Sequence, residues 1–143
     1  MREAGERRAA RAVRFGGADT LAIRSEPVRA PRGNEVIVRV THAAIGATDV
    51  TAVQGRYVLQ PFTRLVPGYD FIGVLETESA MSAALGLRKG RRVAGVLPGM
   101  GAQATRLVVT PKTLVAVPES LGSAVAATLA RSRCRGRARP RRE

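Results

Sequence analysis

The sequence predicts a mainly β domain, a barrel of short strands with a few short helices. Apolar or alternating runs of four to eight residues are separated by glycine- and proline-rich turns, the pattern of barrel-like all-β domains. The pattern changes after Pro118, where an alanine-rich helical segment begins. The chain has 143 residues, which is the size of a single domain. A domain of this size buries roughly 70% of its extended-chain surface.

The strands follow from apolar runs between turn signals. The clearest lies at residues 35–41, where Val36, Val38 and Val40 alternate with Ile37, Arg39 and Thr41. Turn residues at 16–19 and 31–34 precede the second and third strands. The expected strands cover residues 12–15, 21–27, 35–41, 70–77, 92–97, 102–109 and 114–117.

Helices are expected at three places. Thr48 and Asp49 are good helix starters, and Gly55 supplies a stop for this short helix. Residues 81–87 fit either a helical turn or a loop with strand character. Residues 122–130 form the start of a third helix, with Ser123 as its cap.

Both ends of the chain are basic. Residues 1–11 carry charge and alanine, which predicts a disordered or helical extension. Residues 131–143 hold 7 of the 24 Lys and Arg residues and have no apolar face, which predicts a disordered tail. This tail has the composition of GC-rich DNA translated in a wrong frame, so we treat it as an out-of-frame end of a truncated chain.

Composition excludes several classes of protein. Cys134 is the only cysteine and His42 the only histidine, so neither an intrachain disulfide nor a cysteine-based zinc cluster can form. Metal ligands are expected to be absent. No run of 18 apolar residues occurs, so we expect no membrane association and a cytoplasmic location.

Several motifs carry a family resemblance. Residues 44–49 read Ala-Ile-Gly-Ala-Thr-Asp, and residues 67–73 read Pro-Gly-Tyr-Asp-Phe-Ile-Gly. Weaker matches occur at 89–93, 101–105 and 115–121. Together they resemble the medium-chain dehydrogenase/reductase superfamily over residues 12–130, and most of all its zinc-independent, zeta-crystallin-like quinone oxidoreductases. In zinc-containing members a cysteine and a histidine bind the metal where Gly46 and Tyr69 stand here.

The resemblance implies a fold and an activity. Residues 12–121 would form the N-terminal GroES-like domain of the family, a partly open β-barrel. The activity implied is NAD(P)H-dependent reduction of a small-molecule quinone or enone, with NADP as the expected cofactor. The family's cofactor domain needs a Gly-x-Gly-x-x-Gly turn between a strand and a helix, and the glycine-rich segment 95–101 lies between two strands instead. The Rossmann cofactor domain is therefore expected to be absent and the chain inactive alone.

The same resemblance implies the site residues. The candidate catalytic residues are Thr48, Asp49, Tyr57 and Tyr69, and the residues on the cofactor side are Gly46, Ala47 and Thr48. Thr48 would bind substrate or the cofactor ribose, Asp49 would orient Tyr69, and Tyr57 would line the cleft. The alternative is that Thr48 and Asp49 cap a helix and that Tyr69 packs.

Two other roles compete with the oxidoreductase. Seven arginines in the tail could bind nucleic acid without sequence specificity, although no interleaved aromatics support base stacking and we consider nucleic acid an unlikely partner. A lone barrel could also form a homodimer or aggregate through exposed apolar residues such as Val125 and Leu129.

Overall fold

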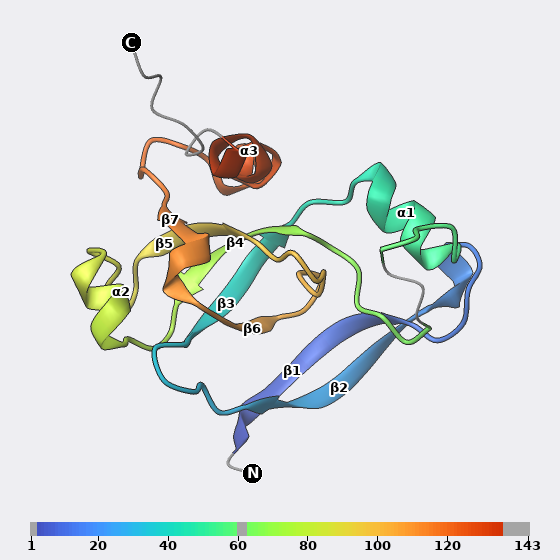
Figure 1. Ribbon diagram of the computed structural model, residues 1–143, viewed down its shortest axis with the longest axis horizontal. Helices are drawn as coiled ribbons and strands as arrows, with labels where there is room; N and C mark the ends of the chain where they lie inside the picture. The colour runs from blue at the N-terminus through green and yellow to red at the C-terminus, as the bar shows by residue number, and fades with distance from the viewer. Residues whose placement is uncertain (1–2, 60–62, 136–143) are drawn as a thin grey trace.

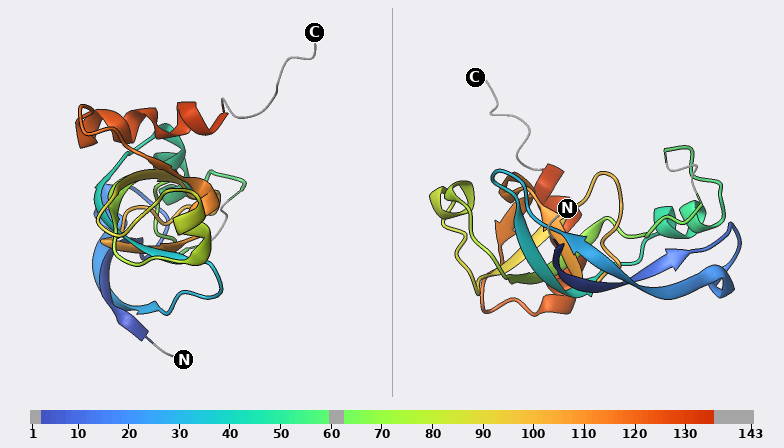
Figure 2. Two further views of the ribbon diagram at one scale, coloured as in Figure 1. Left: turned by 90° about the vertical axis from the view of Figure 1, so that its left-hand side faces the viewer. Right: turned by 90° about the horizontal axis from the view of Figure 1, so that it is seen from below.

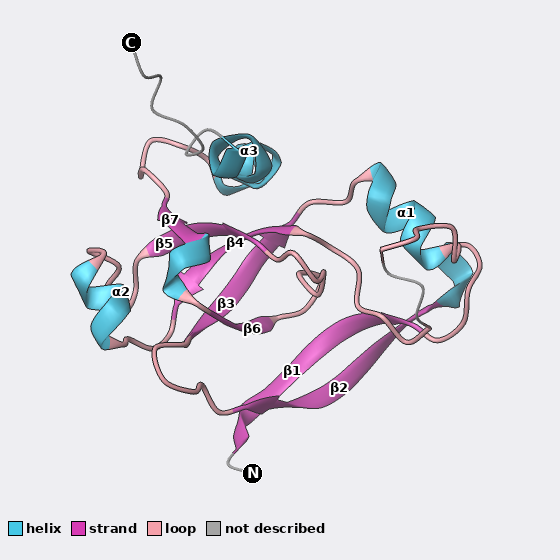
Figure 3. Ribbon diagram, viewed as in Figure 1, coloured by secondary structure: helices cyan, strands magenta, loops and turns pink. Residues whose placement is uncertain are grey.

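The computed structural model describes residues 3–59 and 63–135, which form two antiparallel sheets (Figures 1 and 3). One sheet is a two-stranded ribbon, and the other has five strands in the order β6-β3-β4-β5-β7. The strands are β1 (Glu3–Ala12), β2 (Leu21–Arg29), β3 (Val36–Ala43), β4 (Asp70–Leu75), β5 (Arg92–Val96), β6 (Arg106–Val109) and β7 (Leu114–Ala116). The two sheets do not close on each other, which confirms the prediction of a mainly β, partly open barrel.

An aliphatic core fills the space between the ribbon and the five-stranded sheet. Val36 and Val38 of β3 face it, as their alternation in the sequence predicts, and both are fully buried. Phe71 of β4 is its one large aromatic side chain and is also fully buried. Full burial of each such side chain contributes about 1.5–3 kcal/mol, so this cluster holds the sheets together.

Residues 1 and 2 lie outside the described residues, and the prediction of a disordered or helical extension is wrong for residues 3–11. The chain there forms β1, which pairs with β2 along its length. Ala9 and Ala12 are buried, while Arg7 and Arg11 bind Glu26 on β2 with N–O distances of 3.0 and 2.7 Å. The segment is a strand because its small side chains enter the core and its charges are matched across the ribbon.

The Glu26 carboxylate is the centre of that charge matching. Partial burial would raise its pKa, but the hydrogen bonds from Arg11 and Arg7 outweigh burial and lower the pKa below its ordinary value. Glu26 therefore stays ionised between two cations, which fixes the register of β1 against β2.

The helices are short except the last one. They are α1 (Ala47–Val53), α2 (Ala80–Ala84) and α3 (Ser123–Arg135), with single 3-10 turns at Ala18–Thr20 and Pro111–Thr113. The ambiguous segment 81–87 is thus largely helical, and Ser79 caps α2 by accepting from the Ser82 amide at 3.1 Å. None of the helices among residues 3–59 and 63–135 has both the length and the apolar character needed to cross a bilayer.

Helix α3 covers the face of the five-stranded sheet that points away from the ribbon (Figure 2). Ala126 and Ala127 pack on Ile72 of β4 and Ala94 of β5. The helix continues through Arg135, so the predicted disorder is wrong for residues 131–135, while residues 136–143 lie outside the described residues. Arginine is a good helix former, and extending an existing helix adds a hydrogen bond for each residue fixed.

Candidate functional site

The site predicted from the two longest motifs begins at the turn from β3 into α1. Gly46 is the residue before the helix, in extended conformation, and Asp49 occupies the third helical position. The Asp49 amide donates to the Gly46 carbonyl at 3.0 Å, and Asp49 Oδ2 accepts from the Gly46 amide at 2.7 Å. The expected capping role of Asp49 is therefore present, although Gly46, and not Thr48 or Asp49, is the cap residue.

The second oxygen of Asp49 reaches the other motif. Asp49 Oδ1 accepts from the Gly68 amide at 2.9 Å, across a sequence separation of 19 residues. Only 4% of Asp49 is exposed, and its bond from Gly68 is buried while its bond from Gly46 is partly buried. One buried carboxylate thus joins the start of α1 to the loop before β4.

Tyr69, in the second motif, contacts Tyr57, which follows α1. The Tyr69 hydroxyl donates to the Tyr57 hydroxyl at 3.1 Å, and the two rings meet edge to face with their centroids 6.4 Å apart. Tyr69 is 8% exposed and packs with Ala52 and Met100, whereas Tyr57 is half-buried. The ring of Tyr69 therefore packs in the core while its hydroxyl forms a hydrogen bond. Tyr57 is the more exposed residue of the pair.

The backbone in front of α1 is open. A Cβ added to Gly46 would lie 3.7 Å from Asp49 Oδ2 and 3.8 Å from Thr48 Oγ1, which are ordinary contact distances. Gly46 and Ala47 are exposed, and Thr48 is half-buried beside them. A flat ligand has room to approach the backbone at this point.

Sequence reasoning missed a cavity of about 240 Å³ on the face of α1 that carries Asp49, Val50 and Val53. The 3-10 turn between β1 and β2 closes its other side, with Ile45 and Gln103 at its edge. The sequence carries one indication of this cavity, the helical spacing of Asp49, Val50 and Val53. Its opposite wall comes from segments that are distant in sequence, so the sequence alone does not predict it.

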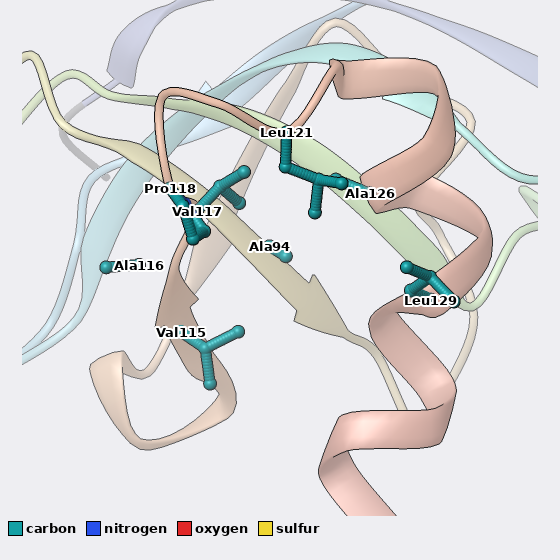
Figure 4. A pocket seen from close by; sticks show the side chains of 8 residues that line it. All are labelled: Ala94, Val115, Ala116, Val117, Pro118, Leu121, Ala126 and Leu129. Carbon is teal, nitrogen blue, oxygen red and sulfur yellow. The ribbon is translucent and has the colours of Figure 1, made fainter.

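A much smaller hollow of about 30 Å³ lies between α3 and the five-stranded sheet (Figure 4). Its lining is apolar and includes Ala94, Leu121, Ala126 and Leu129. Leu129 is 43% exposed and its neighbour on the helix, Val125, is 53% exposed, as the sequence predicts for an uncovered helix face. The hollow has the volume of about one water molecule, and no polar side chain lines it.

The described residues form neither a metal site nor a complete dinucleotide site. Within residues 3–59 and 63–135, no three side chains of histidine, cysteine, aspartate or glutamate gather, and His42 is exposed on β3. All strand pairs of the described chain are antiparallel, whereas a dinucleotide cradle is built on parallel strands. The described residues therefore do not make a complete dinucleotide site.

Comparison with known proteins agrees with this geometry. Residues 32–119 match the family model of the alcohol dehydrogenase GroES-like domain. The chain is 33% identical over 115 residues to mitochondrial enoyl-acyl-carrier-protein reductase from Xenopus tropicalis, covering 80% of this chain and 32% of that protein. It is 29% identical over 115 residues to human quinone oxidoreductase, covering 80% of this chain and 34% of that protein.

A solved structure has the same fold. The crystal structure of a probable oxidoreductase from Mycobacterium abscessus superposes with a TM-score of 0.78 at 27% identity, over 87% of this chain and 39% of that one. The chain spans about a third of the length of the curated relatives it matches. The resemblance noted in the sequence is confirmed, and its similarity extends to both enoyl reductases and quinone oxidoreductases.

Proposed function

Because the chain belongs to the alcohol dehydrogenase GroES-like domain family, we propose that it is the substrate-side domain of an NAD(P)H-dependent, zinc-independent oxidoreductase that reduces quinones or enones. The relatives named enoyl reductase and quinone oxidoreductase support the reaction class. The substrates in these two names share a carbonyl group conjugated to a carbon–carbon double bond. Such a substrate gains electron density on its carbonyl oxygen as it is reduced, so the protein must stabilise that oxygen.

The Tyr57–Tyr69 pair is the observation that carries the proposal. Zinc-containing members place a metal ligand where Tyr69 stands, and a metal would polarise a carbonyl oxygen there. Here a phenol hydroxyl occupies that position and donates to a second, half-buried hydroxyl at 3.1 Å. Tyr57 would donate a hydrogen bond to the carbonyl oxygen, which is the role an oxyanion-stabilising group plays.

The remaining site residues receive supporting roles. Asp49 holds the two motifs at their working separation through its bonds to Gly46 and Gly68. Thr48 would bind the substrate or the cofactor ribose, and the open backbone at Gly46 and Ala47 would face the nicotinamide. NADP is the proposed cofactor, and the described residues would not hold it alone.

Calorimetric titration tests this assignment. Duroquinone is a suitable quinone probe, because its ring carbons are fully substituted and the thiol of Cys134 has no free ring position to attack. We expect the chain to bind duroquinone and to bind NADPH negligibly. We expect Tyr57→Phe to weaken duroquinone binding about tenfold through loss of one hydrogen bond in a shielded site.

Two results would contradict the proposal. Micromolar NADPH affinity of the chain would show that it carries its own cofactor site. Unchanged duroquinone affinity in Tyr57→Phe would show that the Tyr57 hydroxyl does not bind the quinone. Gly46→Ala serves as the steric probe, because its new methyl group fits the fold but narrows the approach to the backbone.

Self-association through α3 is a second candidate role. Val125 and Leu129 are 53% and 43% exposed on one side of the helix. We expect a concentration-dependent dimer by light scattering, which the double change Val125→Gln and Leu129→Gln reduces to monomer. A wild-type chain that is monomeric at all concentrations would rule this role out.

A further inference from the structure

The direction of the hydrogen bond between the two tyrosines defines which hydroxyl proton is free. Tyr69 donates and Tyr57 accepts. A phenol hydroxyl has one proton to donate, so the proton of Tyr69 is used inside the protein. Within residues 3–59 and 63–135 no hydrogen bond uses the proton of Tyr57, so this proton can be donated to a ligand.

Burial explains why the bond takes this direction. Tyr69 is 8% exposed, and its ring is held by Ala52, Met100 and the edge-to-face contact with Tyr57. Burying a hydroxyl costs free energy unless the hydroxyl is hydrogen-bonded, and the oxygen of Tyr57 accepts from that of Tyr69 at 3.1 Å. Tyr57 is half-buried, and its proton can be donated outward without leaving a buried group unsatisfied.

The backbone around Tyr69 strengthens this arrangement. Gly68, the residue before it, has φ +101° and donates its amide to Asp49 Oδ1. A Cβ on Gly68 would lie 3.0 Å from the Gln103 backbone nitrogen, so the chain is closely packed at this point. The position of the Tyr69 ring is therefore set by the fold and does not depend on a ligand.

We infer that Tyr69 is a positioning residue that orients the Tyr57 hydroxyl as a hydrogen-bond donor toward the carbonyl oxygen of a quinone or enone. This inference rests on the proposed function. By accepting a bond from Tyr69, the Tyr57 oxygen becomes a better donor, because hydrogen bonds in a chain polarise one another. Tyr69 also shares the negative charge that the carbonyl oxygen gains on reduction, without touching the substrate.

A double-mutant cycle on duroquinone binding tests the inference in the full chain. We expect Tyr69→Phe to weaken binding about three- to tenfold and Tyr57→Phe to weaken it about tenfold. Because Tyr69 acts through Tyr57, Tyr69→Phe should have no further effect in the Tyr57→Phe background. Phenylalanine keeps the ring, and circular dichroism of each variant checks that the fold is retained.

The outcomes separate the inference from the proposed function. Equal loss from Tyr69→Phe in both backgrounds would mean that the Tyr69 hydroxyl acts independently of Tyr57, and no loss in either would mean that this hydroxyl does not contribute to binding. Either result overturns the inference and leaves the proposed function standing. A wild-type chain that does not bind duroquinone overturns the proposed function and the inference with it.

A measurement without any substitution covers the case in which a variant fails to fold. Tyr57 and Tyr69 are the only two tyrosines of the chain, so tyrosine labelled with ¹³C at Cζ gives two NMR signals. Hydrogen–deuterium exchange of each hydroxyl shifts its own Cζ signal. We expect the Tyr69 hydroxyl to exchange at least about tenfold more slowly than that of Tyr57, because it is buried and donated. Equal or reversed rates would overturn the inference.

Discussion

Replacing Asp49 should separate the two motifs that build the site. The carboxylate accepts from the Gly46 amide at 2.7 Å and from the Gly68 amide at 2.9 Å, and the residue is 4% exposed. Hydrogen bonds to a charged group contribute about 1.5–3 kcal/mol each, so Asp49→Ala should lower the free energy of unfolding by about 4 kcal/mol. Asp49→Asn keeps one acceptor oxygen and should cost about 2 kcal/mol.

Urea denaturation followed by circular dichroism and by tyrosine fluorescence measures both losses. Asp19→Asn is the matched control, because the Asp19 side chain is 72% exposed and its ion pair with Arg14 should contribute less than about 0.5 kcal/mol. Losses below about 0.5 kcal/mol for both Asp49 variants would refute the reasoning, because the carboxylate would then not hold the turn to the loop.

Two further changes test the fold around the site. A methyl group on Gly73 would lie 2.4 Å from the Arg39 carbonyl oxygen, so Gly73→Ala should cost about 3 kcal/mol by urea denaturation, whereas Gly99→Ala, with open space around it, should change stability little. The hydrogen bond from Arg29 lowers the pKa of Glu35 from 4.5 to about 2, so its stabilising effect is complete above about pH 5 and is lost as the pH falls through about 2. The pair is partly exposed, so Glu35→Gln should cost about 1 kcal/mol at pH 7 and nothing near pH 2; an equal cost at both pH values would contradict this.

The sequence predicted the five-stranded sheet well because its signals are local. Alternation in β3 and the turn before β4 each depend on neighbouring residues. Sequence analysis likewise singled out Tyr57 and Tyr69, whose hydroxyls lie 3.1 Å apart in the folded chain. Their roles in catalysis stay predictions.

The features that sequence reasoning missed depend on pairing between distant segments. Strand β1 contains mostly alanine and arginine, and its strand character comes from Glu26 and from the core contacts of Ala9 and Ala12. The Asp49 carboxylate, which the sequence predicts to orient Tyr69, also accepts hydrogen bonds from the backbone amides of Gly46 and Gly68. The partners of β1 and of Asp49 cannot be predicted from the sequence alone, because they come from segments that only the folded chain brings together.

The most direct test of the proposed function is the position of a bound quinone. In an NMR experiment on the full chain with duroquinone, the methyl protons of the ligand should show nuclear Overhauser contacts to the ring of Tyr57 and to the amide of Gly46. Contacts confined to Val125 and Leu129 on α3 would contradict the account, because the quinone would then bind the exposed helix face and not the site that joins the two motifs.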